Sequence, residues 1–406
     1  MNFLRSLANP SFALLWSGQT VSRLGDSFYT VALALWVLEK THSAAAMGLV
    51  LVFFTVPMIL LLLVGGVFVD RLPRLYVMLS SDFLRALLVG LIAVLLGSGR
   101  LEMWHVLVMS ACFGMVDAFF YPAYTAVMPE IVAASDLPSA NSLRSISLQL
   151  TGIIGPALAG WIVARGGFWL AFGIDSLSFV ISAACLLLIL RKSALLKEVR
   201  EVSAESNVLK DLHEGLQTVL QSPWLWITIA IAGVSNLTLS GPFEAALPLL
   251  VAQRFGSAAQ TYGTLMALSS VGSLLGAIWI GRQKRLRRRG YLVYSAWLLA
   301  SLTLTLMGLS SGLIVMGLAV FLWGATWSIV NLSWAVSLQE FVPAERLGRV
   351  SSIDALGSYA LLPVGYALAG FAADRFGAPT IFLWGGLLSA CVVVLGLLHP
   401  TIRAVD

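Results

Sequence analysis

Long apolar segments recur from one end of the chain to the other, and polar residues gather mainly in the short stretches between them. Residues 44–69 and 255–281 carry no charge, and residues 290–339 stay uncharged on both sides of a turn at 310–312. A helix that crosses the hydrocarbon core of a membrane needs about 20 mostly apolar residues. The pattern predicts an all-helical integral membrane protein with twelve transmembrane spans, at 11–38, 44–69, 75–97, 103–127, 141–164, 168–190, 222–250, 257–281, 290–309, 312–338, 350–373 and 378–399.

The longest polar stretch, residues 191–221, divides the predicted spans six and six. It holds charged residues of both signs and is too short for a folded domain. Such a stretch is typical of a linker that includes an amphipathic helix lying on the membrane surface. The sequence thus predicts an N-terminal six-helix bundle at 1–190, a cytoplasmic linker at 191–221 and a C-terminal six-helix bundle at 222–406.

A shift of the chain by 210 positions reveals an internal repeat. The segment Gly155-Pro-Ala-Leu-Ala-Gly160 aligns with Gly365-Tyr-Ala-Leu-Ala-Gly370, and upstream Glu130 aligns with Glu340 without a gap. An even number of spans separates the two copies, so they have the same orientation in the membrane. A parallel repeat of this kind is related by an axis along the membrane normal. It predicts two six-helix bundles that face each other, with a site between them near the middle of the membrane.

The composition supports this interpretation. Hydrophobic residues make up 59% of the chain and charged residues 11%, whereas soluble domains carry about 25% charged residues. This disfavours a nucleic-acid binder, an extracellular disulfide scaffold and most soluble enzymes. Most of the 25 Lys and Arg residues fall on one side of the membrane when the N-terminus is placed in the cytoplasm, as the positive-inside rule requires. The sequence predicts a multi-pass protein with both termini in the cytoplasm.

No pattern for nucleotide, metal or cofactor binding occurs in the sequence. The four His and three Cys residues are scattered, and there is no GxxxxGK phosphate-binding loop. An intramembrane enzyme would need a His/Asp, Ser/His or metal constellation within the membrane, and the sequence contains none. A sensor or scaffold would be expected to carry a sizeable soluble domain. We therefore expect a transporter, not an enzyme, that needs no cofactor and no metal.

Two sets of motifs resemble a known family. After the second span, Gly66-Val-Phe-Val-Asp70-Arg71-Leu-Pro-Arg74 resembles the GxxxDRxGR signature of the major facilitator superfamily, with Pro73 in place of the Gly. Phe119-Phe-Tyr-Pro-Ala with Pro129-Glu130, and Gln339-Glu-Phe-Val-Pro-Ala-Glu-Arg-Leu-Gly-Arg-Val-Ser351 in the second half, resemble the branch that contains macrolide-efflux proteins and the enterobactin exporter. The resemblance covers essentially the whole chain. It implies a twelve-helix drug:proton antiporter, monomeric, in the cytoplasmic (inner) membrane of a prokaryote.

Ionisable residues inside the spans are the candidates for a coupling site, because each costs at least about 2.5–3.5 kcal/mol at the centre of a membrane helix. Arg23 and Asp26 lie three apart in the first span, which lines the central cavity in the family that the chain resembles. Asp117 lies midway along the fourth span without a charged neighbour at helical spacing, and Glu244 follows a Ser240-Gly241-Pro242 break in the seventh. We predict that these four residues serve proton coupling or substrate binding. A structural role is the alternative for each.

Other charged residues are predicted to be structural or to form a gate. Asp82 and Arg85 lie three apart in the third span and Asp175 lies in the sixth; both spans are peripheral in the family that the chain resembles, which favours structural roles. The signature loop and the repeat motivate a further hypothesis, a cytoplasmic latch that holds the outward-open state. Its predicted members are Gly66, Asp70, Arg71, Arg74, Glu130 and Asp354.

Aromatic and amide side chains in the spans are the predicted substrate contacts. Aromatic faces suit flat or cationic ligands, and an amide inside a span needs a hydrogen-bond partner or a ligand. The predicted cavity residues are Tyr29, Tyr121, Tyr124, Asn236, Trp327 and Asn331. Packing against lipid or neighbouring helices is the alternative for the aromatic members of this set.

These patterns predict a secondary active transporter that exports amphipathic small molecules or drugs by alternating access, in exchange for protons. Its expected partners are the substrate, protons and the lipid bilayer, with no nucleic acid. The alternative is an exporter or flippase for a siderophore, a metabolite or a lysophospholipid. An anionic substrate would need Arg23 free of an ion pair.

Overall fold

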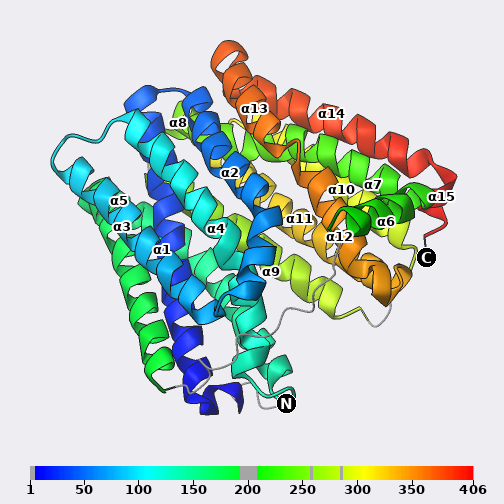
Figure 1. Cartoon of the computed structure of the whole chain (residues 1–406). Helices are drawn as coiled ribbons and strands as arrows, with labels where there is room; N and C mark the ends of the chain where they lie inside the picture. Colours follow the sequence, from blue (N-terminus) through cyan, green and yellow to red (C-terminus); the bar gives the residue numbers. More distant parts are fainter. Residues whose placement is uncertain (1–4, 193–207, 257–258, 284–286, 406) are drawn as a thin grey trace. The chain divides into compact units, whose positions relative to one another are not determined.

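A computed structural model describes residues 5–192, 208–256, 259–283 and 287–405 (Figure 1). At 63–71, 192, 208–213 and 344–345 it describes the backbone only. Within these limits every regular element is a helix. The predicted all-helical fold is therefore confirmed.

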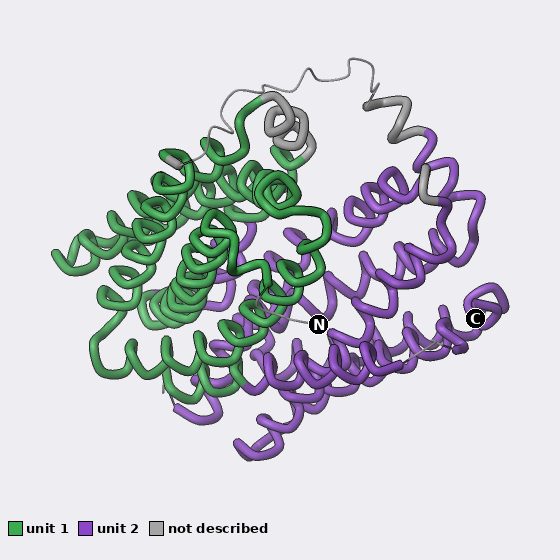
Figure 2. The backbone as a smooth tube through the Cα atoms, turned by 90° about the horizontal axis from the view of Figure 1, so that it is seen from below, with its two compact units in different colours: residues 1–40, 53–202, 258–267 green, residues 41–52, 203–257, 268–406 purple. Residues whose placement is uncertain are grey.

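The chain separates into two compact units, coloured in Figure 2. Unit 1 comprises Met1–Lys40, Phe53–Val202 and Ala258–Ala267, and unit 2 comprises Thr41–Val52, Ser203–Ser257 and Leu268–Asp406. Two helices cross this division. Helix α2 (Ala44–Arg71) begins in unit 2 and ends in unit 1, whereas α9 (Ala259–Gly281) begins in unit 1 and ends in unit 2. The units thus exchange the first turns of one helix each.

Unit 1 is built around three packed helices. Helix α3 packs against both α4 and α5, and α5 holds two predicted spans that meet at a kink. At the kink Gly167 has φ +76°, a left-handed conformation that glycine adopts without steric cost. Apart from α2 and α9, the helices of this unit are η1 (Arg5–Ala8), α1 (Pro10–Thr41), α3 (Arg74–Gly97), α4 (Met103–Ile131) and α5 (Leu137–Lys192).

Unit 2 has α10 packed against α11 and α14, and the linker helix α6 packed against α12. The Arg349 guanidinium donates to the Glu214 carboxylate, which ties α12 to α6. Apart from α2 and α9, its helices are α6 (Val208–Gln221), α7 (Pro223–Ser235), η3 (Asn236–Ser240), η4 (Pro242–Ala246), α8 (Leu247–Phe255), α10 (Arg289–Leu309), α11 (Leu313–Phe341), α12 (Ala344–Tyr359), α13 (Leu362–Phe376), α14 (Ala378–Leu398) and α15 (Pro400–Arg403).

The predicted break in the seventh span takes the form of two π-helical turns, η3 and η4, within one continuous helical run. Pro242 lacks a backbone N–H, and a wider turn accommodates the missing hydrogen bond. Gly241 lies against α13, where an added Cβ would come within 2.6 Å of the Gly365 carbonyl oxygen. The local widening therefore coincides with a close helix contact inside unit 2.

Ten described helical segments are long and apolar enough to cross a membrane. One of them, Leu137–Arg191, contains two predicted spans on either side of Gly167. Helix α1, with 32 residues, is not among these ten segments, but it has the length to cross a membrane and covers the remaining predicted span. The arrangement is consistent with the predicted twelve-helix fold.

The repeat reappears in the packing of helices. Under the shift of 210 positions, Gly160 and Pro156 of α5 correspond to Gly370 and Tyr366 of α13. In both copies the repeat segment touches the first turns of a helix that crosses between units. Four glycines make these contacts, and a Cβ on any of them would lie 2.2–2.5 Å from a backbone oxygen: Gly160 on Ala259, Gly263 on Pro156, Gly370 on Ala44 and Gly48 on Tyr366.

A close contact of this kind in unit 1 gives a first prediction. A Cβ at Gly114 of α4 would lie 2.0 Å from the Phe54 carbonyl oxygen of α2, whereas one at Gly173 of α5 would meet no atom within 4 Å. Because overpacking costs about 1–3 kcal/mol, we expect Gly114→Ala to lower the thermal stability of the purified protein in detergent. Gly173→Ala is the matched control and should leave it unchanged or slightly raise it. Equal melting temperatures for the two variants would contradict the contact.

Candidate functional site

An arginine at the centre of unit 1 organises a group of buried charged residues. Arg85 of α3 is 5% exposed, and its Nη2 donates to the Asp117 carboxylate on α4. Its Nη1 lies 3.9 Å from Oδ1 of Asp82 on its own helix, beyond hydrogen-bond distance. Asp117, which the sequence presents as lacking a charged neighbour, is therefore ion-paired. Helical spacing within α4 could not find this pair because the partner lies on α3.

Aromatic rings surround the same guanidinium. The Arg85 Cζ lies 4.0 Å from the ring centroid of Phe120, and 5.5 and 5.6 Å from those of Phe113 and Phe179. Ring faces attract a cation without occupying its N–H donors. Arg85 Nε has no hydrogen-bond partner. The three rings thus stabilise the buried Arg85 cation, while its N–H groups remain available to donate to carboxylates.

Asp82 is fully buried and sits at the end of a short hydrogen-bond chain. The Ser182 hydroxyl of α5 donates to Asp82 Oδ2 at 2.6 Å, and the Gln19 amide of α1 donates to the Ser182 oxygen at 2.9 Å. The other carboxylate oxygen, Oδ1, has no hydrogen-bond partner. Burial of an incompletely satisfied carboxylate is costly, which marks Asp82 as more than a packing residue.

A second group of carboxylates lies where α1 meets the last part of α5. Asp175 is fully buried; the Ser178 hydroxyl donates to its Oδ1 at 3.3 Å, and Oδ2 has no partner. A Cβ at Gly25 would lie 2.4 Å from Asp175 Oδ1, so the carboxyl group packs directly on the α1 backbone. The neighbouring Asp26 is half-buried and interacts electrostatically with Arg85, Asp117 and Arg23.

The predicted partner of Asp26 is engaged with an aromatic ring. The Arg23 guanidinium lies 5.5 Å from the Tyr124 ring centroid, and Arg144 lies 4.9 Å from the same ring. Among the described residues no salt bridge joins Arg23 to Asp26. Tyr124 is therefore a buried contact for two guanidinium groups from α1 and α5.

Charge is unbalanced in the interior of unit 1. The described spans carry four carboxyl groups (Asp26, Asp82, Asp117 and Asp175) away from their ends, against the three guanidinium groups of Arg23, Arg85 and Arg144. Ions inside a membrane protein need a counter-charge. A proton or a bound cation on one carboxyl group would restore the balance. In the described part of the chain, no group of three or more His, Cys, Asp or Glu side chains is arranged to hold a metal ion.

The remaining predicted aromatic residues of unit 1 differ in exposure. The Tyr29 ring stacks on Phe113 at 5.3 Å with an interplanar angle of 12°, and meets Phe172 edge-on. Tyr121 is 59% exposed and Tyr124 is buried. Tyr29 thus touches the aromatic shell of Arg85, whereas Tyr121 is the tyrosine of this set that is open to a ligand or lipid.

Unit 2 contains an aromatic stack instead of an ion pair. Phe243 of η4 stacks on Trp323 of α11 at 4.9 Å, and Trp323 stacks on Trp327 at 5.3 Å. Glu244, next to Phe243, is exposed. Asn331 is also exposed, and its amide donates to the Trp327 carbonyl oxygen at 2.8 Å. Phe243 and Trp323 are buried, whereas Trp327 is half-buried. Trp327 and Glu244 are therefore the members of this group that are open to a flat cationic molecule.

The other predicted amide has a structural partner. Asn236, at the start of η3, is buried, and its Nδ2 donates to the Ser358 carbonyl oxygen of α12 at 2.8 Å. Its Oδ1 accepts from Ser240 at 3.4 Å. The amide therefore fastens the π-helical turns to α12, and a ligand would have to compete with those bonds.

The predicted latch residues with described side chains lie in both units, Arg74 and Glu130 in unit 1 and Asp354 in unit 2. Arg74 Nη1 forms a salt bridge with Glu130 at 2.6 Å and donates to the Ala126 carbonyl oxygen. In unit 2, Asp354 accepts from the Trp334 indole at 3.0 Å. For Gly66, Asp70 and Arg71 the structure describes the backbone alone, so the latch contacts predicted for them lie outside the described structure.

A counterpart of the Arg74–Glu130 pair, which the sequence analysis does not identify, occurs in unit 2. Arg289 at the start of α10 pairs with Glu340 near the end of α11. Glu340 is the repeat equivalent of Glu130, but the equivalent of Arg74 is Lys284 and not Arg289. The repeat therefore indicates the carboxylate of this pair and not its cation.

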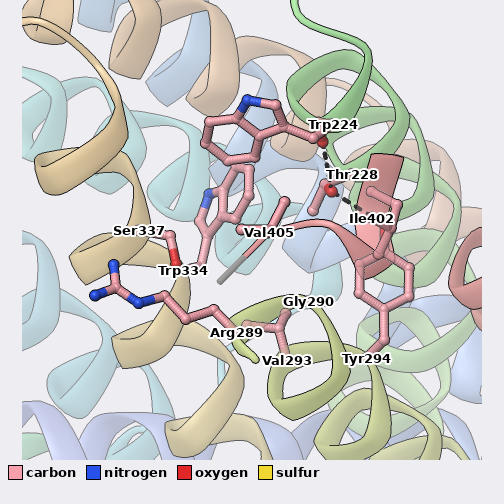
Figure 3. Close-up of a pocket in the computed structure, with 10 residues that line it drawn as sticks. All are labelled: Trp224, Thr228, Arg289, Gly290, Val293, Tyr294, Trp334, Ser337, Ile402 and Val405. Carbon is pink, nitrogen blue, oxygen red and sulfur yellow. Dashed lines mark hydrogen bonds between the residues drawn. The ribbon is translucent and has the colours of Figure 1, made fainter. Parts of the chain in front are cut away.

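Arg289 also borders a small pocket in unit 2, shown in Figure 3. Trp224, Tyr294 and Trp334 line it together with the C-terminal residues Ile402 and Val405. The Tyr294 and Thr228 hydroxyl groups are hydrogen-bonded at 3.0 Å, and Thr228 also donates to the Trp224 carbonyl oxygen. None of the residues predicted for the coupling or substrate site lines this pocket.

The model of the Major Facilitator Superfamily matches residues 15–365, which is most of the chain. The chain belongs to the major facilitator superfamily. It is a multi-pass membrane transporter of this superfamily and not an enzyme, as predicted.

Relatives with efflux names match this superfamily member along nearly its whole length. Macrolide efflux protein A of Streptococcus pyogenes is 26% identical over 97% of both chains. The multidrug efflux pump Tap of Mycolicibacterium fortuitum is 29% identical over 98% of this chain and 97% of its own. The enterobactin exporter EntS of Escherichia coli O1:K1 / APEC is 26% identical over 95% and 93%. The predicted resemblance to macrolide-efflux proteins and the enterobactin exporter is therefore confirmed.

Solved structures of transporters share the fold. The nucleoside transporter NupG superposes with a TM-score of 0.75 at 14% identity, over 98% of each chain. A bacterial homologue of the iron transporter ferroportin, in its inward-facing state, gives a TM-score of 0.74 at 16% identity, over 96% of this chain and 99% of that one. At these identities the likeness establishes the major facilitator fold alone.

Proposed function

We propose that this transporter exports amphipathic small molecules across the cytoplasmic membrane of a prokaryote by alternating access, in exchange for protons. The observation that carries the proton coupling is the excess of carboxyl groups over guanidinium groups in the interior of unit 1. An unbalanced carboxylate in a membrane interior gains most from a proton. Asp26 and Asp117 are the exchange candidates because both are partly exposed, whereas Asp82 and Asp175 are fully buried.

The proposed substrate class is supported by aromatic and acidic side chains of unit 2. The half-buried Trp327, stacked on the buried Trp323, and the exposed Glu244 suit a flat molecule that carries positive charge. Full-length relatives named for macrolide and multidrug efflux support this class. The role of each predicted cavity residue stays a prediction.

An anionic substrate such as a siderophore is the second candidate. A full-length relative is named as an enterobactin exporter, and Arg23 is held by a tyrosine ring and not by a described carboxylate. If this candidate is correct, Arg23→Ala should abolish transport of the anionic compound, whereas a cationic dye should not be transported by the wild type.

The test uses inverted membrane vesicles that contain the protein. Accumulation of ethidium and of a macrolide is followed under an imposed proton gradient, with and without a protonophore. We expect accumulation that collapses with the protonophore and that Asp26→Asn or Asp117→Asn lowers by about tenfold or more, which corresponds to about 1.4 kcal/mol. Accumulation that survives the protonophore would contradict proton coupling.

A further inference from the structure

We propose that Arg85 is a shared counter-ion, which pairs with Asp117 when that carboxylate is ionised and moves to Asp82 when Asp117 takes up a proton. The inference rests on the proposed proton coupling and assigns to Asp82 and Arg85 a role in it. The sequence treats these two residues as a structural pair. In the structure, however, the tighter partner of Arg85 lies on another helix.

The geometry places both carboxylates on one guanidinium. Nη2 of Arg85 is bonded to Asp117 Oδ1, and Nη1 stands 3.9 Å from Asp82 Oδ1. Asp82 Oδ1 and Arg85 Nε have no hydrogen-bond partner. The guanidinium group thus has a donor to spare, and the nearby Asp82 Oδ1 has no donor of its own. A shift of about 1 Å would bring Arg85 Nη1 and Asp82 Oδ1, now 3.9 Å apart, to hydrogen-bond distance.

The three phenylalanine rings make such a shift inexpensive. Their ring centroids lie 4.0–5.6 Å from the Arg85 Cζ atom. The attraction between a cation and a ring face does not require an N–H group to point in a fixed direction. A guanidinium fixed by hydrogen bonds to carbonyl groups would have to break them to move. Arg85 has to exchange only one carboxylate for the other.

Exposure decides which carboxylate takes the proton. The Asp117 side chain is 29% exposed, whereas Asp82 is fully buried. Protons arrive through water, so Asp117 is the carboxylate that exchanges them. What favours an ionised Asp82 is not its burial but the hydrogen bond from the Ser182 hydroxyl to Oδ2 and the Arg85 cation 3.9 Å from Oδ1; we infer that together they keep it charged. Proton uptake converts the Asp117 carboxylate to a neutral acid and breaks its ion pair with Arg85, and Arg85 then pairs with Asp82. The net charge of the three side chains changes from −1 to 0, which balances the single proton.

Other ionisable groups face this triad from the packed helices. Helix α1 contributes Arg23, Asp26 and Tyr29, and α5 contributes Asp175; the Asp26 carboxylate interacts with both Arg85 and Asp117, and Asp175 with Arg85. None of these groups is hydrogen-bonded to the Arg85 guanidinium in the described structure. These groups contribute to the electrostatic potential around the triad, whereas Asp82 and Asp117 are the carboxylates within ion-pair distance of Arg85.

The decisive variant is Asp82→Asn in purified protein reconstituted into liposomes of phosphatidylethanolamine and phosphatidylglycerol. Asp82→Asn removes the second counter-ion and a nearby negative charge, and both changes disfavour protonation of Asp117. We expect the pH of half-maximal, gradient-driven ethidium accumulation to fall by about one unit or more. Ethidium counterflow, which needs no proton gradient, should stay within about twofold of wild type, a change of about 0.4 kcal/mol.

Two further variants keep the test interpretable. Ser182→Ala removes the hydrogen bond to Asp82 Oδ2 without removing the charge, and should move the midpoint in the same direction by less. If Asp82→Asn does not fold, the midpoint measured for Ser182→Ala serves as the test instead. Asp175→Asn is the matched comparison, because Asp175 is an equally buried aspartate on α5 without an ion pair to Arg85 in the described structure. It changes only the electrostatic potential around the triad, so it should move the midpoint by clearly less than Asp82→Asn does.

The outcomes separate the two proposals. Wild-type protein that shows no proton-dependent transport of any probe would overturn the proposed function and this inference together. Coupled transport by wild type, with unchanged midpoints in Asp82→Asn and Ser182→Ala, would overturn the inference alone. A midpoint that moves to higher pH in Asp82→Asn would also overturn it, because Asp82 would then be opposing the protonation of Asp117.

Discussion

Replacement of Arg85 with methionine is expected to lower the free energy of unfolding by about 3–5 kcal/mol, because it leaves buried carboxylates without their cation. Arg85 is bonded to Asp117 and is the nearest described cation to Asp82, which is fully buried. Methionine has a similar reach and keeps the contact with the surrounding rings. The loss of charge, and not a cavity, should therefore dominate the result.

The measurement is the melting temperature of the purified protein in detergent, compared with the triple variant Arg85→Met, Asp82→Asn, Asp117→Asn. Because the triple variant removes the carboxylates together with their cation, it should recover most of the lost stability. Arg85→Lys keeps the charge but loses the forked donors, and should lie between Arg85→Met and wild type. An Arg85→Met protein as stable as wild type would show that the carboxyl groups are already neutral.

The sequence predicted the fold because a membrane imposes simple rules on length, hydropathy and charge. Apolar length indicated the spans, and the shift of 210 positions found the repeat whose glycines, Gly160 and Gly370, make equivalent contacts in the structure. These features depend on residues that are near one another in sequence or related by a fixed offset. They do not depend on which faces of the helices meet.

The partners of individual charges could not be predicted for the same reason. Helical spacing indicated the Asp82–Arg85 pair but not the tighter Arg85–Asp117 pair, which joins α3 to α4. In a soluble helix the polar face indicates which side is buried, but a span is apolar on every side. The sequence of α4 therefore does not indicate that Asp117 lies on the face that meets α3. That orientation is set by how the helices of unit 1 pack. The exchange of the first turns of α2 and α9 between the units escaped prediction on the same grounds.

Asp374 provides the clearest example of a contact that spacing does not indicate. It lies near the end of α13 and accepts hydrogen bonds from the Ala44 and Ala45 backbone N–H groups at 2.7 and 3.1 Å, and from the Ser43 hydroxyl. The first N–H groups of a helix lack partners within it and favour a negative charge. Asp374 therefore caps α2 from another helix of unit 2. The repeat places Ala164 at the equivalent position of α5, so α5 offers α9 no carboxylate at that position.

We expect Asp374→Ala to loosen the start of α2, because the loss of a helix cap costs about 0.5–2 kcal/mol. The reporter is Ala44→Cys, buried in the structure, in a chain whose three native cysteines are replaced by alanine. Its labelling by a membrane-impermeant maleimide on whole cells should become about 2–30 times faster, the factor that about 0.5–2 kcal/mol provides. Asp374→Asn, which keeps one acceptor oxygen, should have a smaller effect.

The repeat supplies the control for this experiment. Ala259, at the start of α9, contacts Gly160 through its carbonyl oxygen as Ala44 contacts Gly370, and it is also buried. Because Asp374 lies against the start of α2 and its repeat equivalent is an alanine, labelling at Ala259→Cys should not respond to Asp374→Ala. Equal acceleration at both cysteines would instead indicate general destabilisation, and no acceleration at Ala44→Cys would exclude Asp374 as a cap that limits opening.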